Sequence, residues 1–400
     1  MITSGQPSLN PRLVKEADSL CAAGYQVKVL YQYWNSWGTA MDELLLPAKK
    51  WQSVRVGGDP KQECLTYFFS RMIHKVALFG YTCGISFFAK YALARSSFFL
   101  IRATKKHKAD LYIAHNLAAL PAAVFAAEKY KSKCGFDAED FHRQETTDDL
   151  KSVDLQLKSS IENIFILKLN YMSVASLLTG EAYNQLYKNR PACILNVFPK
   201  TQKFTKINVN QTLKLVWFSQ YIGFGRGLET VFNALSQLTK LDFELHLIGF
   251  LSAEMEKFMQ SSSFPTAIIS KITIHAPLPP DQLLSFISRF DIGLATEISQ
   301  PLNRDICLSN KIFSYIQAGL AVLASDTTAQ KQLVSTWPQI GKLYDKNSIE
   351  NLTACIKDFY ADRELLSSCK KDAFELGQTT LNWETESIKF LSLIENTLAV

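Results

Sequence analysis

Short apolar runs, many of them rich in β-branched residues, alternate with longer helical patterns along the whole chain. This alternation is typical of βαβ units, in which helices cover a sheet of parallel strands. After a very short run at residues 1–3, the first half of the chain predicts strands at 26–34, 53–56, 110–115, 134–138 and 173–179. The second half predicts strands at 213–219, 243–248, 272–276, 291–295 and 321–324.

The strand pattern stops and then restarts around residues 194–210, which are largely polar and without periodicity. Such a segment is typical of a domain linker. We therefore expect an α/β protein in which two Rossmann-like βα domains, at 1–200 and 201–382, face each other across a cleft. Residues 383–400 predict a final helix, which we expect to cross back and pack on the first domain.

The bulk composition fits two globular domains. The chain has 400 residues, 47% hydrophobic and 20% charged, which is enough to bury two cores. No apolar run approaches the roughly 20 residues that cross a bilayer, and the start lacks the order of a signal peptide. We expect a cytoplasmic protein. Its eight cysteines and six histidines have no zinc-like spacing, so no metal or other cofactor is expected.

The positive charge of the protein lies in its first half. The net charge is +6, and residues 1–200 carry 25 Lys and Arg against 17 Asp and Glu. A basic face is typical of proteins that meet nucleic acid, anionic lipid or an anionic substrate. Nucleic acid is not expected as a partner, because no helix-turn-helix, RNA-recognition or zinc-finger pattern accompanies the charge.

Residues 67–100 are crowded with phenylalanines that Arg and Lys residues interrupt. One interpretation is a pair of buried helices. The other is an amphipathic surface that rests on an anionic membrane and meets a lipid-linked acceptor, which would make the protein peripheral on the inner face of the membrane.

A glycine-rich stretch, Q-Y-I-G-F-G-R-G-L-E, follows the predicted strand at 213–219 and precedes a helical pattern. Gly223 and Gly227 let the backbone approach a ligand, and a helix that begins after them presents free N–H groups to an anion. Arg226 would add a charge-assisted contact to a diphosphate. The dinucleotide fingerprint is not complete, because Leu228 stands where it needs a glycine. A plain turn is the alternative.

A second candidate element lies at residues 305–326. It predicts a loop, a helix that starts near Ser309, a stop at a glycine and a buried strand. Ligands of doubly wound sheets bind outside the carboxyl ends of the strands. Ser309, Asn310 and Lys311 in the first helical turn would therefore face the same crevice as Arg226. A solvated helix start without a ligand is the alternative.

The run S-N-K-I-F-S-Y-I-Q-A-G-L-A-V-L-A-S-D at 309–326 resembles the donor-binding element of the family 4-like glycosyltransferases of the GT-B fold, a retaining group that uses nucleotide sugars. Four other stretches follow in the same order as in that family. They are T-S-G-Q-P-S-L-N-P-R at 3–12, F-D-A-E-D at 136–140, N-V-F-P at 196–199 and R-G-L at 226–228.

The resemblance implies roles for donor-side residues. Arg226 would neutralise the donor diphosphate, Gly223 would let the backbone come close, and Asn310 and Lys311 would hold the sugar and phosphates. No metal would be needed, because basic side chains and a helix end stabilise the departing nucleotide. Where many relatives have a glutamate, this chain has Ser314, whose hydroxyl can form a hydrogen bond but carries no charge.

The resemblance also implies an acceptor side in the first domain. Gly5 and Ser8 lie in the stretch that resembles the first acceptor-side loop, and Asp140 lies in the one that resembles Y-D-A-H-E. Asp137 would orient or deprotonate the acceptor hydroxyl, with a structural carboxylate as the alternative. His115 ends a predicted strand at the crevice edge and is the second catalytic candidate, with a structural histidine as the alternative.

The function that these features predict is transfer of a sugar, with retention, from a nucleotide diphosphate sugar to a hydroxyl of a cell-surface glycan or a lipid-linked acceptor. Two alternatives share the architecture. One is a nucleotide-sugar epimerase, which would need acidic groups on both sides of the sugar. The other is a catalytically impaired scaffold or binding subunit, for which Ser314 is the main argument.

Overall fold

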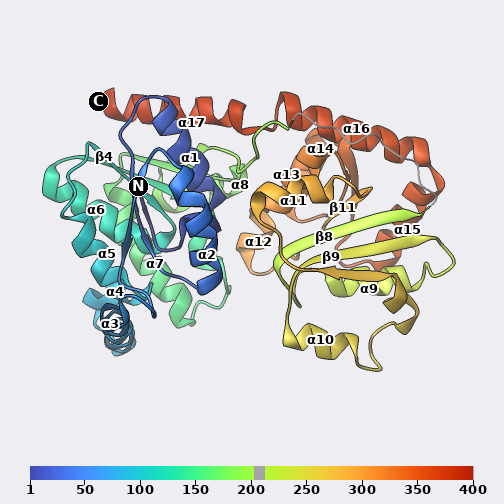
Figure 1. The fold of residues 1–400 in the computed structure, drawn as a ribbon, viewed down its shortest axis with the longest axis horizontal. Coiled ribbons are helices and arrows are strands. Elements are labelled where there is room, and N and C mark those ends of the chain that lie inside the picture. The colour runs from blue at the N-terminus through green and yellow to red at the C-terminus, as the bar shows by residue number, and fades with distance from the viewer. Residues whose placement is uncertain (202–211, 400) are drawn as a thin grey trace. The chain divides into compact units, whose positions relative to one another are not determined.

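The computed structural model describes residues 1–201 and 212–399 and divides the chain into two compact units (Figure 1). Unit 1 comprises Met1–Leu195, Pro301–Asn303 and Glu386–Val400, and unit 2 comprises Asn196–Gln300 and Arg304–Thr385. The boundary between the two units thus lies between residues 195 and 196, whereas the sequence predicts it between residues 200 and 201. Most of the expected linker, residues 202–210, lies outside the described residues.

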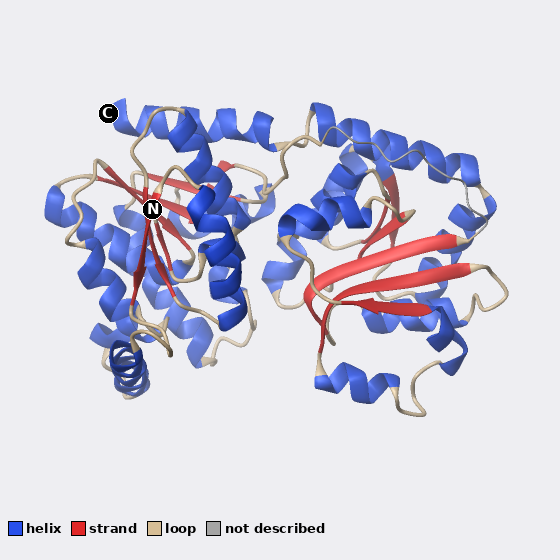
Figure 2. Cartoon of the chain, in the orientation of Figure 1, coloured by secondary structure: helices blue, strands red, loops and turns tan. Residues whose placement is uncertain are grey.

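Unit 1 contains a parallel sheet of seven strands in the order β3-β2-β1-β4-β5-β6-β7 (Figure 2). The strands are β1 (Ile2–Thr3), β2 (Lys28–Gln32), β3 (Gln52–Val56), β4 (Leu111–His115), β5 (Lys133–Ala138), β6 (Tyr171–Val174) and β7 (Ala192–Cys193). The prediction at 173–179 is wrong beyond residue 174, because the chain leaves β6 there and a helix begins at Leu177. The short strand β7 was not predicted.

Helices cover the sheet of unit 1. They are α1 (Pro11–Ala22), α2 (Ser36–Leu45), α3 (Cys64–Thr82), α4 (Ala89–Ala92), α5 (Ser97–Thr104), α6 (Leu120–Tyr130), α7 (Val153–Phe165) and α8 (Leu177–Tyr187). Helix α1 starts cleanly because Pro11 occupies its first turn and the side chain of Asn10 accepts a hydrogen bond from the Leu13 amide. Its apolar face, with Leu13 and Ala17, is fully buried.

Unit 2 contains a parallel sheet of six strands in the order β10-β9-β8-β11-β12-β13. The strands are β8 (Leu213–Ile222), β9 (Phe243–Leu251), β10 (Ile272–His275), β11 (Ile292–Ala295), β12 (Ala321–Ser325) and β13 (Gly341–Tyr344). Strand β8 runs three residues beyond its predicted end at 219, through an irregularity between Phe218 and Tyr221. Part of the predicted glycine-rich loop is therefore strand, and the loop begins at Gly223.

The helices of unit 2 complete its layers. They are α9 (Leu228–Ser236), α10 (Ala253–Met259), α11 (Pro280–Ile287), α13 (Asn310–Ala318), α14 (Thr328–Thr336), α15 (Ile349–Ala361) and α16 (Arg363–Thr379). Helix α12 (Leu302–Ile306) has residues in both units. Helix α13 ends at Gly319, which has a left-handed φ of 71°, as the sequence predicts.

The last helix, α17 (Trp383–Ala399), matches the predicted terminal helix closely. From Glu386 onward its residues belong to unit 1. Phe390 and Ile394 are buried, and the Glu386 carboxylate accepts a hydrogen bond of 2.9 Å from the Leu195 amide. Most of the C-terminal helix, from Glu386 onward, is thus part of unit 1, whereas its first residues, 383–385, belong to unit 2.

Helix α3 does not form the buried pair that one interpretation of residues 67–100 required. Phe68, Phe69 and Phe79 on this helix are about half exposed or more, at 62%, 49% and 71%. Helix α5, in contrast, buries Leu100 and Ile101. Within the described residues, no helix has both the length and the apolar character needed to cross a bilayer.

Candidate functional site

Each sheet has a point at which the connections turn in opposite directions. In unit 1 this point lies between β1 and β4, and in unit 2 between β8 and β11. The loops that leave the carboxyl ends of these strand pairs diverge and leave room for a ligand. The candidate residues of the sequence fall at both places.

In unit 2, the loop 223–227 connects β8 to α9 and is held against the end of β11. Gly227 has a φ of 77°, and a Cβ atom there would lie 2.9 Å from the Cβ of Thr296. The Trp217 indole donates to the Thr296 hydroxyl, which in turn donates to the carbonyl of Arg226 at 2.8 Å. Glycine is required at 227 because both the backbone conformation and the space exclude a side chain.

Three cationic side chains gather around this loop: Arg226 in the loop itself, Lys311 and Arg304. Lys311, in the first turn of α13, forms an ion pair with Glu297, which follows β11, and both side chains are buried. Ser325 at the end of β12 holds Glu297 in place, because its hydroxyl accepts a 2.9 Å hydrogen bond from the Glu297 amide. Arg304 donates to the carbonyl of Gly225.

The charges of this cluster do not balance. Burial lowers the pKa of Lys311. The negative charge of Glu297 raises this pKa, and the positive charge of Arg226 lowers it further. The pKa of Glu297 is also lowered, because Lys311, Arg226 and Arg304 together outweigh the effect of its burial. Within the described residues, the Arg226 side chain has no hydrogen-bond or ion-pair partner. Only Lys311 is in an ion pair, so Arg226 and Arg304 remain without an ion-pair partner among the described residues, and their positive charge attracts an anion.

The start of helix α13 belongs to the same cluster. Asn310 is exposed, and the buried hydroxyl of Ser309 has no hydrogen-bond partner among the described residues. The first N–H groups of a helix lack partners within the helix and carry partial positive charge. Ser314 is different: it is fully buried, and its hydroxyl donates to the Asn310 carbonyl at 2.9 Å.

Sequence patterns located part of this cluster. They placed Arg226 and Lys311 near each other, and the electrostatic effect of one on the other agrees with that placement. Glu297 and Arg304 were not predicted. Glu297 follows the predicted strand at 291–295, so polar residues after that strand were an available signal. No sequence signal pointed to Arg304, because only the fold brings it to Gly225.

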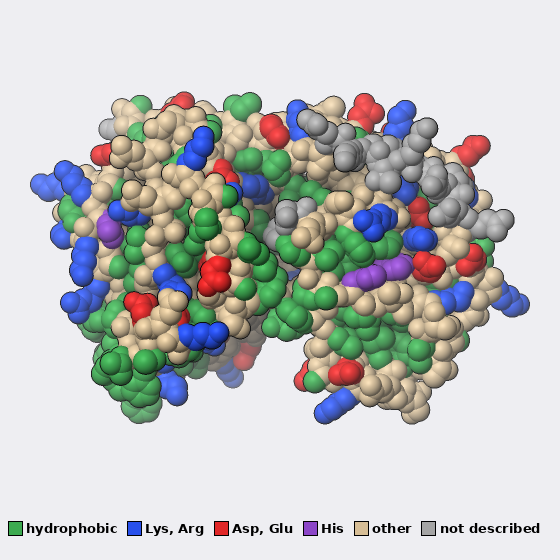
Figure 3. All heavy atoms as spheres, viewed as in Figure 1, with side chains coloured by type: hydrophobic (Ala, Val, Ile, Leu, Met, Phe, Trp, Pro, Cys, Tyr) green, Lys and Arg blue, Asp and Glu red, His purple; other side chains and the backbone are tan. Residues whose placement is uncertain are grey.

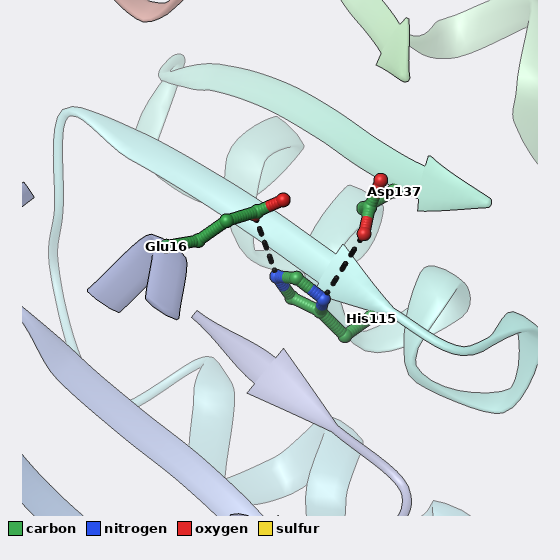
Figure 4. Close-up of side chains that lie close together, drawn as sticks. All are labelled: Glu16, His115 and Asp137. Atoms are coloured by element: carbon green, nitrogen blue, oxygen red, sulfur yellow. Dashed lines mark ion pairs between the residues drawn. The ribbon is translucent and has the colours of Figure 1, made fainter. Parts of the chain in front are cut away.

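In unit 1, a buried cluster of charged residues lies beside the central strands (Figure 4). Arg12 on α1 holds both carboxylate oxygens of Asp137 at the end of β5, one of them at 2.7 Å. His115 at the end of β4 lies between two carboxylates, with Nε2 3.2 Å from Glu16 and Nδ1 3.4 Å from Asp137. None of these four side chains is exposed.

The unit 1 cluster is balanced internally. Burial would lower the pKa of His115, but Glu16, Glu139 and Asp137 raise it to about 10. The pKa of Glu16 is raised by its burial and by Asp137, whereas that of Asp137 is lowered by Arg12 and His115 against the effect of burial. When His115 is protonated, the positive charges of Arg12 and His115 offset the negative charges of Asp137 and Glu16.

Glu16, His115 and Asp137 have ligand atoms within 4.8 Å of one another, a spacing that suits a metal ion. The guanidinium of Arg12, however, already contacts both carboxylates, with Nε 3.3 Å from Glu16. A divalent cation would have to sit beside this fixed positive charge, so the donor set does not favour a metal.

The structure gives the two catalytic candidates, Asp137 and His115, no exposed surface. Asp137 also accepts a 2.8 Å hydrogen bond from Ser173, so its oxygens are occupied. In this arrangement neither side chain can touch an acceptor hydroxyl. Their catalytic role remains a prediction, and their visible role is structural. Sequence patterns did not identify Arg12 or Glu16, although the two stand four residues apart on a predicted helix.

The acceptor-side candidates surround the same edge of the unit 1 sheet. The amide of Gly5 donates to the Thr3 hydroxyl, and the amide of Ser8 donates to Asp42 at 2.9 Å. Asp140 is partly buried, and burial and the charge of Glu145 raise its pKa. These residues are held in place by other parts of unit 1.

Asn116, directly after His115, has a strained backbone. Its φ of 67° and ψ of 145° form a combination that is nearly restricted to glycine. Its side chain accepts a 2.7 Å hydrogen bond from Thr3 at the end of β1. The strain therefore lies at the switch point of this sheet, where a ligand is expected.

Comparisons with known proteins identify the fold. No protein-family profile and no curated protein matches the sequence. The chain superposes along 99% of its length on 99% of HepE from Anabaena in complex with UDP-glucose, with a TM-score of 0.66 at 13% identity. It covers 99% of sucrose-phosphate synthase from Thermosynechococcus elongatus with a TM-score of 0.66 at 13% identity.

A third similar structure is the lipopolysaccharide outer core galactosyltransferase WaaB, with a TM-score of 0.59 at 10% identity over 99% of both chains. All three likenesses extend over both units, and both sheets have the strand order of a Rossmann-like domain. The chain therefore has the two-domain GT-B fold that these glycosyltransferases share.

Proposed function

We propose that the protein is a glycosyltransferase that moves a sugar from a nucleotide diphosphate sugar to an acceptor hydroxyl. The observation that carries this proposal is the unbalanced cationic cluster of unit 2. Beside the carboxyl ends of β8 and β11, Lys311 is paired with Glu297, whereas Arg226 and Arg304 have no ion-pair partner among the described residues. A diphosphate supplies the negative charge that this cluster lacks.

The chemistry of the cluster suits a departing nucleotide diphosphate. Arg226 has no partner among the described residues and can form a forked contact with phosphate oxygens. Gly223 and Gly227 let the loop backbone approach, and Ser309, Asn310 and the N–H groups of α13 can hold the sugar and phosphates. Such preorganised positive groups stabilise a leaving anion, so the proposed reaction needs no metal. We assign it retention of configuration, in line with the resemblance of residues 309–326.

Acceptor binding is assigned to unit 1, at the loop that contains Gly5 and Ser8 and at Asp140. Asp137 and His115 would act there by holding the ends of β4 and β5 in position. The proposed acceptor is a cell-surface glycan or a lipid-linked molecule. Support comes from similar folds: one structure contains UDP-glucose, and another is a lipopolysaccharide galactosyltransferase. The proposed location is the inner face of the membrane.

Ser314 brings no charge to the site. Its hydroxyl donates to the Asn310 carbonyl of the same helix, so its proton is not free to form a hydrogen bond with a ligand. A glutamate at this position would add a second carboxylate to the cluster and reduce its surplus charge. The serine therefore keeps the site more strongly cationic.

The test is a transfer assay with UDP-, GDP- and ADP-sugars, with and without a lipid extract of the cell envelope. Free nucleotide that depends on both a donor and the extract is the expected result. The variant Arg226→Met should lose most of this release. The matched control is Arg289→Met, because Arg289 is exposed and lies just before β11, at the opposite end of the strand.

Each other outcome rejects the proposal in a recognisable way. Isomerised sugar without an acceptor would identify an epimerase, and binding without any turnover would identify a scaffold. Equal loss in Arg226→Met and Arg289→Met would show that the cluster is not the site. The anomeric configuration of the product, measured by NMR, decides between retention and inversion.

A further inference from the structure

Helix α3 has an inverted distribution of side chains. Its buried residues are the small Ser70, Ala77 and Gly80. Gly80 is packed so closely that a Cβ atom there would lie 2.4 Å from the ring of Phe88. A surface helix normally turns its large apolar side chains inward, so this helix presents the wrong face to its own domain.

The outward face of α3 is a continuous apolar stripe. Its members follow one another at spacings of three or four residues, apart from one adjacent pair, which places them on one side of the helix. They are Leu65, Phe68, Phe69, Met72, Val76 and Phe79, with exposed fractions of 72%, 62%, 49%, 43%, 57% and 71%. Ile85 and Phe87, exposed by 51% and 60%, follow the end of the helix.

Figure 3 shows apolar side chains gathered at the place where Figure 1 labels α3. Isolated exposed apolar residues are normal, but a stripe of this kind marks an interaction surface. Burying six such side chains in an apolar medium would be strongly favourable.

The charge around the stripe is of one sign. Residues 65–109 contain eight Lys and Arg and no Asp or Glu. Lys75, Arg95 and Arg102 are exposed, and none of them has a carboxylate within 4.0 Å among the described residues. Arg71 lies over the Tyr67 ring, 3.4 Å from its centroid, and Lys90 lies over Phe87 at 3.9 Å. Basic and aromatic groups beside an apolar helical face are typical of helices that lie in a membrane interface.

We infer that α3, together with Ile85 and Phe87, is a membrane-docking surface that inserts its apolar stripe into an anionic lipid bilayer. The helix would lie in the plane of the interface, since it is not apolar enough to span the bilayer. Its basic neighbours would contact lipid phosphates. A protein partner is the less favoured occupant, because it would have to match both the stripe and 45 residues without one acidic group.

This inference does not depend on sugar transfer, so its test uses no substrate. The full-length protein is sedimented with vesicles of phosphatidylcholine alone and of phosphatidylcholine mixed with phosphatidylglycerol. Binding to the mixed vesicles, and much weaker binding to the neutral ones, is expected. Because each buried phenylalanine contributes to the binding, Phe68→Gln and Phe79→Gln should each weaken it roughly tenfold or more.

Matched controls come from elsewhere in unit 1. Leu167→Gln and Leu177→Gln remove apolar side chains that are exposed by 69% and 56%, and binding should not change. Lys75→Glu should weaken binding to the anionic vesicles roughly tenfold, because it reverses one charge at the surface. Arg190→Glu, at an exposed position of unit 1, should have a much smaller effect.

Because all these positions are exposed, the variants should fold normally, and circular dichroism would verify this. The inference fails if the wild-type protein does not bind anionic vesicles, or if the α3 variants and the controls behave alike. It also fails if the wild-type chain self-associates without lipid and the α3 substitutions abolish that association, because a second copy would then cover the stripe.

Discussion

The two units place charged clusters at equivalent points of their sheets, but the clusters differ in their charge balance. In unit 1, Arg12 pairs with Asp137, and His115 pairs with Glu16 at 3.2 Å. In unit 2, Arg226 and Arg304 remain as surplus cations beside the Lys311–Glu297 pair. The charges of the first cluster offset one another, whereas the second retains positive charge that suits an anion.

This difference separates structural from ligand-binding charges better than residue type does. A buried ion pair that is complete contributes to the fold, and removing one member is costly. A cation without a partner costs the fold little when it is removed but matters to a ligand. The four predictions below test this distinction, and they are ordered from the largest expected effect to the smallest.

The largest effect is expected for Arg12→Met. It would leave the buried carboxylates of Asp137 and Glu16 without their guanidinium, which costs about 3–5 kcal/mol of unfolding free energy. The measurement is chemical denaturation followed by circular dichroism. Arg226→Met is the control and should change stability by no more than about 0.5 kcal/mol. Equal stability of the two variants would contradict the assignment of a closed cluster.

The second prediction concerns the pH dependence of stability. The folded protein raises the pKa of His115 from 6.5 to about 10. The stabilisation from this histidine is therefore complete below about pH 6.5 and is lost as the pH rises through 10. The difference in unfolding free energy between the wild type and His115→Gln should shrink by about 2–4 kcal/mol over that interval.

Comparison with the variant is needed because other buried groups titrate in the same range. Burial lowers the pKa of Lys15 to about 7, which gives a pH effect of the opposite sign. That effect is common to both proteins and cancels in the difference. A difference that stays constant from pH 6.5 to 10 would show that His115 is not held in its charged form.

The third prediction concerns ligand affinity. Arg226→Met should weaken the binding of a nucleoside diphosphate by about 10–100-fold, because a charge-assisted contact is lost. Isothermal titration calorimetry with UDP, GDP and ADP would measure this. Arg304→Met should have a smaller effect, since Arg304 acts through the carbonyl of Gly225. Unchanged affinity in both variants would remove the charge argument for unit 2.

The smallest effect is expected for Ser314→Ala. The lost hydrogen bond to the Asn310 carbonyl should cost about 1 kcal/mol or less. Nucleotide affinity should change less than about twofold, since the hydroxyl is buried and already donates to the Asn310 carbonyl. A large loss of affinity in the same titration would instead show that Ser314 turns toward the donor.

Sequence patterns were sufficient for elements whose signals are local. The alternation of strands and helices, the glycine that ends α13 and the loop between β8 and α9 are all encoded within a few neighbouring residues. Hydrophobic periodicity and turn residues act at that range. The errors lie at element ends, as in β6 and β8, and in the short edge strands β7 and β13, which were not predicted. In both cases tertiary pairing decides where a strand forms and how far it continues.

The ion pairs and the partners of the buried charges followed from the tertiary structure alone. Arg12 and Asp137 are 125 residues apart in the chain, and Arg304 reaches Gly225 across 79 residues. For residues 67–100 the sequence left two interpretations open, buried helices and an amphipathic surface, and it did not show which face α3 would turn outward. That choice depends on the small residues that pack beneath it. Local sequence patterns thus account for most helices and strands of this protein, whereas the partners of its charged side chains follow from the fold, because ion pairing and burial depend on distance in space.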